Sequence, residues 1–437
     1  MKRVLRFSLL ASTALAAAPA LAAAGDGDVT FYRDVLPILQ DNCQTCHRAV
    51  GANSGGMVAP MSLLTYDETR PWAKSIARMA VSRAMPPWFA TEATRGKFHD
   101  ERVLTDQQIE TLTRWASTGA AAGNAADAPA AARFAQDENA GWSFRQPDLV
   151  VPLPEPYAVA DDVEDLNIDF TSVLTAEQLP ADAWIQGLEF RVGGRSVHHM
   201  CASAFAPGEK ESFQVGELGR NGLGCIALGS GPTFLPEGFA QLLQKGSRIK
   251  FSMHYHKEPG PGSGFTDRSE LGFYFARGPV SHRAVYDAIG NVSFEIPPGN
   301  DRWRVGSAKK FEQDSYLLAL WPHAHLRAVA ARYELHTPDG ATELLLDVPR
   351  YDQEWQVVYR YREPKLIPAG SRIEVTLWYE NSVERANERR FDSRQATTFG
   401  PATTDEMMIG FLNWAPAAEL DPAAAAAPAA IPSSGSE

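Results

Sequence analysis

Residues 248–256 read RIKFSMHYH, and this stretch sets the pattern for most of the chain. Polar and apolar side chains alternate along it. Because successive side chains of a β-strand point to opposite faces, the alternation predicts a strand with one apolar face and one polar face. His254 and His256 then share the polar face with Arg248, Lys250 and Ser252.

Short β-rich runs broken by Gly and Pro recur through residues 141–415. The other runs are residues 183–192, 272–276, 293–296, 315–320, 329–336, 354–362 and 372–380. Repeated short strands with turn signals predict a β-sandwich or jelly-roll architecture. The region is long for one sandwich, so we expect two packed β domains, over residues 145–290 and 291–415.

Eight of the ten histidines lie in this β-rich region, and six of them fall in three tight motifs. The motifs are Val197-His198-His199-Met200, Met253-His254-Tyr255-His256 and His323-Ala324-His325. His323 and His325 share a strand face and can bind one metal ion. Neighbours in a flat strand point apart, so His198 and His199 can converge only at a strand end, a bend or a bulge. An isolated pair of histidines needs no metal, but three clustered motifs favour copper or zinc.

The N-terminus has the features of an export signal. Lys2, Arg3 and Arg6 precede a run of small and apolar residues, and Ala-rich cleavage patterns end at Ala24. Residues 1–24 are therefore predicted to be a cleaved signal peptide, with a retained anchor helix as the alternative. No later stretch approaches the roughly 18 apolar residues of a membrane span. We expect a periplasmic or secreted protein.

A c-type haem attachment motif follows, at Cys43-Gln44-Thr45-Cys46-His47. Two thiols at this spacing can add to the two vinyl groups of one porphyrin, and the adjacent His47 can bind the iron. A redox CxxC pair or half of a zinc site is the rival interpretation. The chain has only four cysteines, too few for a disulfide scaffold, and its net charge of −12 excludes a basic nucleic-acid surface.

Residues 25–122 are predicted to form a small all-α cytochrome c domain around this haem. Helical spacing appears in residues 29–40, 66–81 and 105–115. The candidates for the second axial ligand are Met57, Met61, Met79, Met85 and His99. Met85 is preferred, because the two prolines that follow it hold an extended loop that can present its thioether to the iron; an open site is the alternative.

Two stretches have low-complexity composition. Residues 123–144 belong to an Ala-rich connection and are predicted to be a linker, and residues 416–437 are predicted to be a disordered tail. No internal sequence repeat is apparent.

The β-rich region resembles the copper type II, ascorbate-dependent monooxygenase family, whose members include peptidylglycine alpha-hydroxylating and dopamine beta-monooxygenases. Five ordered motifs carry the resemblance. They are Val197-His198-His199-Met200, Met253-His254-Tyr255, Ile296-Pro297-Pro298-Gly299, His323-Ala324-His325-Leu326 and Thr404-Asp405-Glu406-Met407. The resemblance covers roughly residues 145–415 and implies two jelly-roll-like domains with one copper ion on each, facing a shared cleft.

The resemblance also implies which residues bind the two copper ions. His198, His199 and His254 would hold an electron-transfer copper. His323, His325 and Met407 would hold an oxygen-binding copper, and the soft thioether of Met407 favours Cu(I). Met408 is the competing ligand, but it would point to the opposite strand face. His256 is expected to be solvent-facing or to support the site from outside, and His99, His282 and His336 have no assigned role.

The sequence departs from the family where substrate would bind. Positions at which the peptide-processing members hold a carboxylate clamp carry Trp321, Ile409 and Phe411, which indicates a small apolar or aromatic substrate. Cys201 and Cys225 do not match the family's disulfide pattern well, so a bridge and two separate thiols both remain possible.

The domain order predicts an oxidoreductase in which the fused haem passes single electrons to the three-histidine copper, replacing or assisting ascorbate. Dioxygen, a small-molecule substrate and a periplasmic electron donor are the expected partners. A haem and copper electron-transfer or copper-binding protein without hydroxylase activity is the alternative from another class. A degenerate β module for protein contact is the weaker third option.

Overall fold

The computed structural model describes residues 29–48, 59–135, 139, 141–194, 196–211, 221–227 and 231–421. The predicted signal peptide, Met57 and residues 422–437 of the predicted tail lie outside these ranges. Within them, no helix has the length and apolar character needed to cross a membrane.

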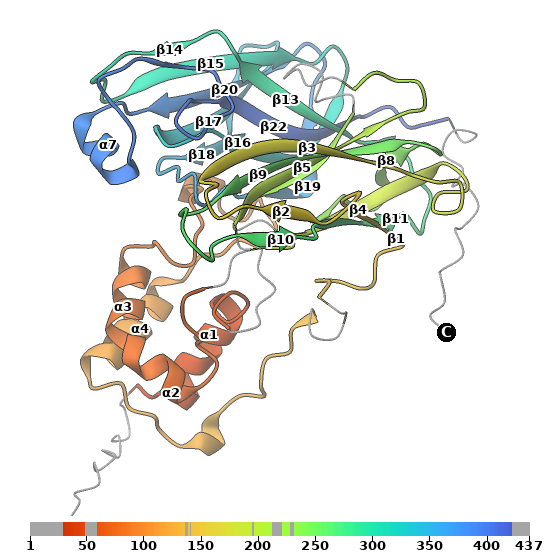
Figure 1. Cartoon of the computed structure of the whole chain (residues 1–437). Coiled ribbons are helices and arrows are strands. Elements are labelled where there is room, and N and C mark those ends of the chain that lie inside the picture. The colour runs from red at the N-terminus through yellow and green to blue at the C-terminus, as the bar shows by residue number, and fades with distance from the viewer. Residues whose placement is uncertain are drawn as a thin grey trace, which may run out of the picture.

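Helices form the N-terminal part of the described chain (Figure 1). They are η1 (Phe31–Val35), α1 (Leu36–Asn42), α2 (Tyr66–Thr69), η3 (Arg70–Trp72), α3 (Ala73–Val81), η4 (Glu92–Thr94), α4 (Asp106–Ser117) and η5 (Ala125–Asp127). Capping boxes at Thr65 and Thr105 fix the starts of α2 and α4. These helices share a core of their own around Phe31, Leu39 and Trp115.

The rest of the described chain is mostly β-sheet and falls into two units. The first unit contains β1 (Leu149–Pro152), β2 (Tyr157–Val159), β3 (Asp165–Val173), β4 (Ala183–Arg191), β5 (Val197–Phe205), β6 (Gly222–Ala227), β7 (Thr233–Phe234), β8 (Phe239–Leu243), β9 (Arg248–His256), β10 (Phe265–Asp267), β11 (Glu270–Phe275) and β12 (His282–Arg283). The alternation in residues 248–256 packs Ile249, Phe251 and Met253 into the core of this unit, as the sequence predicts.

The second unit has its own core, which includes Leu317, Tyr333 and Val375. Its elements are β13 (Val285–Asn291), β14 (Glu295–Ile296), β15 (Trp303–Lys310), β16 (Ser315–His323), β17 (Ala328–His336), β18 (Thr342–Val348), β19 (Tyr359–Ile367), β20 (Arg372–Tyr379), α7 (Val383–Arg389), β21 (Thr397–Thr398) and β22 (Met408–Pro416).

Both units have the same strand order. The sheets of the first unit are β1-β11-β4-β8 and β3-β9-β5-β6, and those of the second are β13-β22-β16-β19 and β15-β20-β17-β18. When the eight main strands of each unit are numbered in chain order, the two sheets of either unit follow the orders 1-8-3-6 and 2-7-4-5, the arrangement of a jelly roll. The repeat therefore exists in the fold, although the sequence shows none.

The two units meet through one sheet of each. Trp321 and Phe411, from the β13-β22-β16-β19 sheet, pack in one buried cluster with Cys201 and Cys225, from the β3-β9-β5-β6 sheet. The two cysteines lie opposite each other on β5 and β6 and form a disulfide, which decides between the alternatives left open by the sequence.

Two boundaries differ from the predicted domain limits. Val285–Asn291 is β13 and pairs with β22, so this strand belongs to the second unit although the predicted limit was residue 290. The helical region is also not independent of the sheets. Phe98 forms a β-bridge with Tyr361 and is part of the core of the second unit, against which Trp88 also packs. A separate cytochrome c domain thus stays a prediction.

Candidate metal centre

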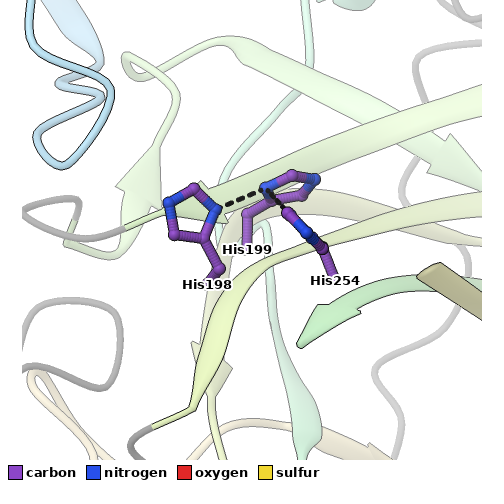
Figure 2. A group of neighbouring side chains, drawn as sticks. All are labelled: His198, His199 and His254. Carbon is purple, nitrogen blue, oxygen red and sulfur yellow. Dashed lines mark hydrogen bonds between the residues drawn. The ribbon is translucent and has the colours of Figure 1, made fainter. Parts of the chain in front are cut away.

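Three histidines of the first unit have ring nitrogens that converge on one point. His198 and His199 lie near the start of β5, and His254 lies near the end of β9, the antiparallel neighbour of β5. Nδ1 of His199 is 3.2 Å from Nδ1 of His198 and 3.4 Å from Nδ1 of His254. Figure 2 shows the three rings grouped around this point. One nitrogen from each ring lies within 4.8 Å of the others, which suits three ligands of one ion.

A β-bulge brings the two neighbouring histidines together. The register of β5 against β9 shifts between Val197 and His199, so the bulged strand carries an extra residue at His198. This irregularity lets His198 and His199 point to one place, which a flat strand would forbid. A bulge is one of the three geometries, with a strand end and a bend, that were expected to let the two neighbouring histidines converge.

The second predicted ligand set lies at the end of the facing sheet. His323 is the last residue of β16, and the rings of His323 and His325 lie 5.6 Å apart at an angle of 89°. Nδ1 of His323 is 2.6 Å from Oε1 of Gln356, which leaves Nε2 of His323 free for a metal ion. Nδ1 of His325 is buried and has no hydrogen-bond partner within the described ranges.

Met407 and Met408 face opposite sides, as expected for neighbours at a strand start. Met407 packs in the cluster between the units, together with Trp321 and Phe411. Met408 is the first residue of β22 and is fully buried in the core of the second unit. Of the two thioethers, that of Met407 therefore lies in the contact between the units, and its role as a ligand stays a prediction.

A buried carboxylate, which the sequence analysis did not select, holds this second set in place. Glu406 accepts hydrogen bonds from the backbone N–H groups of His325 (2.9 Å), Arg327 (2.6 Å) and Met407 (3.3 Å). Burial raises the pKa of Glu406 to about 7, against the lowering effect of these bonds and of Arg327. Its position directly before Met407 was the only available sequence signal.

The two ligand sets lie against each other rather than across a wide cleft. The ring centroids of His199 and His323 are 5.6 Å apart. The predicted substrate wall of Trp321, Ile409 and Phe411 is buried, and the cavity beside Trp321 and Phe411 has a volume of only about 20 Å³. The shared cleft that the resemblance implies stays a prediction.

Burial keeps the candidate ligands neutral. It lowers the pKa of His198 to about 3 and that of His323 to about 4, and it lowers the pKa of His199 and His325 well below the ordinary value. Neighbouring imidazoles lower the pKa values of His198 and His199 further. Neutral imidazole is the form that binds metal ions.

These shifts predict an acid-sensitive metal-free protein. An unfolded histidine titrates near 6.5, so below that pH the unfolded chain binds more protons than the folded one, and stability falls as pH drops. We expect the melting temperature of the metal-free protein to decrease from pH 7 to pH 4. The decrease should be smaller in the H198A/H323A variant, as measured by thermal melts. Equal slopes in both proteins would contradict the expectation.

The haem-attachment motif sits at the end of the first helix. Cys43 follows α1, and the backbone N–H of His47 donates to the carbonyl of Cys43 (2.9 Å), so a tight turn holds both thiols and the imidazole together. Nδ1 of His47 is 3.3 Å from the carbonyl oxygen of Met61, which leaves Nε2 for an axial bond. Burial raises the pKa of Cys43 to about 12 and also raises that of Cys46.

A cavity of about 470 Å³ lies between the helical region and the second β unit, and Met85, Trp88 and Arg350 are among its lining residues. This volume is in the usual range of ligand and cofactor sites. Arg102 also lines the cavity and is close enough to Cys46 to act on its pKa, although Cys43, Cys46 and His47 do not themselves line it. Haem attachment at Cys43, Cys46 and His47, with Met85 as the second ligand, therefore stays a prediction.

The other candidates for the second axial ligand fit less well. Met79 is exposed on α3, and the Met61 carbonyl contacts His47, the proposed axial ligand on the other face of the haem. His99 is exposed and lines a different cavity, beside Arg360 and Tyr361.

The remaining histidines of the β-rich region lie outside both ligand sets. His256 is exposed, with its ring centroid 6.2 Å from that of His198. His282 stacks on Phe239, and His336 lies beside Glu374 at the far end of β17.

The sequence analysis missed a second carboxylate, Asp165, at the start of β3. Its Oδ1 lies 2.6 Å from Nε2 of His254. Burial alone would raise the pKa of Asp165, but hydrogen bonds from His254 and Thr403 outweigh it and hold that pKa well below its usual range. No spacing rule links residue 165 to residue 254; only the pairing of β3 with β9 brings them together.

Comparison with known proteins adds no relative of close similarity. No protein-family model and no curated protein matches the chain. Among solved structures, the major capsid protein P2 of bacteriophage PM2 is 8% identical, with a TM-score of 0.27, and covers 62% of this chain and 98% of its own. The cowpea mosaic virus top component is 4% identical, with a TM-score of 0.33, and covers 63% and 91%. Likenesses this weak carry no argument about function.

Proposed function

We propose that this protein is an exported copper-dependent monooxygenase, which hydroxylates a C–H bond of a small apolar or aromatic substrate with dioxygen. The observation that carries the proposal is the convergence of His198, His199 and His254 directly beside His323 and His325. Burial lowers the pKa values of His198, His199, His323 and His325, and neutral imidazoles crowded into one contact suit a metal ion.

Copper, when bound, supplies the one-electron chemistry that activates dioxygen. Hydroxylation consumes one dioxygen, two electrons and two protons, and it yields the hydroxylated substrate and water. The chain contributes ligand geometry: the bulge at His198 aims two imidazoles at one point, Gln356 orients His323, and Glu406 fixes the backbone of His325 and Met407.

The nature of the substrate is proposed from the wall beside the second ligand set. Trp321 stacks on Phe411 with 4.8 Å between ring centroids, and Tyr286 stacks on the same ring at 5.3 Å. These three stacked rings suit an apolar or aromatic molecule better than a peptide carboxylate. The cavity that adjoins these rings is small, about 20 Å³.

A c-type haem is proposed as the source of single electrons, with ascorbate as an alternative or additional reductant. Its attachment residues would be Cys43, Cys46 and His47, with Met85 as the second axial ligand. The chain around Trp88 and Phe98 packs on the second β unit, whereas the domain order had suggested delivery to the three-histidine site of the first. The route between these parts stays a proposal.

The test is metal and haem analysis joined to an oxygen assay on the mature, haem-matured protein. We expect one covalent haem and about two copper ions per chain, with oxygen uptake that matches hydroxylated product from a small aromatic substrate. Efficient hydroxylation of a peptidyl-glycine would contradict the proposed substrate class. Absence of copper after reconstitution would contradict the proposed function.

The closed contact between the units favours one second candidate, a haem and copper electron-transfer protein. The cavity beside Trp321 and Phe411 is small, about 20 Å³. Full copper and haem content, with redox cycling but no product from any substrate, would support this candidate over the monooxygenase.

A further inference from the structure

Asp165 lies between the three-histidine cluster and the second β unit. It is the first residue of β3, which pairs with β9, and its side chain is 28% exposed. Oδ1 of Asp165 is 2.6 Å from Nε2 of His254, and Oδ2 accepts a hydrogen bond of 3.2 Å from the backbone N–H of Thr403. The Asp165 carboxylate therefore contacts a candidate metal ligand through Oδ1 and the second β unit through Oδ2.

The first of these bonds determines how His254 can bind a metal ion. A carboxylate is a hydrogen-bond acceptor, so Nε2 of His254 carries the proton that it donates to Asp165. The lone pair then lies on Nδ1, the atom that is 3.4 Å from Nδ1 of His199. A carboxylate behind a ligating imidazole fixes both its tautomer and its ring orientation.

The second bond connects this imidazole to the loop that carries Met407. Thr403 lies between β21 and β22, and its hydroxyl is 3.4 Å from Nε2 of His254. The side-chain amide of Asn167, also on β3, donates to the carbonyl of Pro401 (3.1 Å), so β3 holds the loop at two points. The two ligand sets are thus linked through β3 as well as through their direct contact.

We infer that Asp165 is a positioning residue, which orients His254 for a metal ion and ties the loop before Met407 to the first β unit. The inference rests on the metal-binding role proposed above. Its consequence is that Asp165, although not a ligand, sets the copper affinity of the three-histidine site. Loss of such a supporting carboxylate typically costs 10- to 100-fold in metal affinity.

The alternative is that the carboxylate only stabilises the contact between the units. Two substitutions separate these roles. D165N keeps the shape and leaves one oxygen to accept from Nε2 of His254, but removes the charge; D165A removes both bonds. The matched control is D169N on the same strand, because Asp169 is an exposed carboxylate that pairs with Lys250 at 2.8 Å and contacts no histidine.

The experiment is a Cu(II) titration of the haem-loaded full chain against a competing chelator, with electron paramagnetic resonance spectra of the loaded proteins. We expect D165A to weaken one of two copper sites by about 10- to 100-fold and to change its spectrum. We expect D165N to show a smaller loss and D169N to match the wild type. Thermal melts of the metal-free proteins report any purely structural effect.

Unchanged copper affinity and spectrum in D165A would overturn the inference, whether or not its melting temperature falls. A wild-type protein that binds no copper would instead overturn the proposed function on which the inference rests. The two failures are distinguishable because the first is read from the variant and the second from the wild type.

Discussion

Replacing His323 and His325 together by alanine is expected to remove one of the two copper ions and to lower hydroxylation by about a thousand-fold or more. The reason is that the two imidazoles are the strong ligands of the second set, and Met407 alone is too weak to hold the ion. A thousand-fold loss corresponds to about 4 kcal/mol of transition-state stabilisation, the scale of a lost metal centre. Copper content and product formation of H323A/H325A measure both effects.

His256 provides the matched control for this variant. It is an exposed imidazole near His198 but belongs to neither set, so H256A should retain two copper ions and normal turnover. If H323A/H325A kept both ions and full activity, the second metal site would be refuted. If it kept the copper of the first set but lost all turnover, the assignment of the oxygen-reacting site to His323 and His325 would be supported.

Some strands of the two β units could be predicted from alternation, whereas others, such as β3, β13 and β22, were not among the predicted runs. Residues 248–256 form β9 with the predicted bounds. A half-buried strand requires only that apolar and polar residues alternate, and this alternation can be recognised in a short stretch of sequence. The jelly-roll strand order depends instead on pairings between distant segments. This strand order can be recognised only from the structure, which places β22 between β13 and β16.

The candidate site was predictable where its residues cluster in sequence. The three histidine motifs are conspicuous in the sequence, and a bulge was one of the three geometries, with a strand end and a bend, that the prediction allowed at His198 and His199. Asp165 and Gln356 carry no local pattern, because one carboxylate or amide looks like any surface residue in sequence, and Glu406 was marked only by its position before Met407. Their roles come from tertiary hydrogen bonds to His254, His323 and His325, which only the fold creates.

The sequence also did not allow us to predict where the helical region packs against the β units. Phe98 and Trp88 look like core residues of a small helical domain, but they pack in the second β unit around Tyr359 and Tyr361. Hydrophobicity indicates that a side chain will be buried, but it does not indicate in which core the side chain will lie.

Substituting serine for both Cys43 and Cys46 is expected to abolish covalent haem while leaving the copper sites intact. Each thioether bond needs one thiol, so only the double variant removes both bonds. The structure holds the two cysteines on one tight turn beside His47, at a distance in sequence from every candidate copper ligand. The haem stain of a denaturing gel and the pyridine haemochrome spectrum should fall to background in C43S/C46S. Each single variant should retain a haem held by one bond.

The control is C201S/C225S, which removes the other cysteine pair and should keep its haem, because that disulfide joins β5 to β6 far from the motif in sequence. A wild-type protein with no haem, but with a redox-active Cys43–Cys46 pair or bound zinc, would favour the rival interpretations.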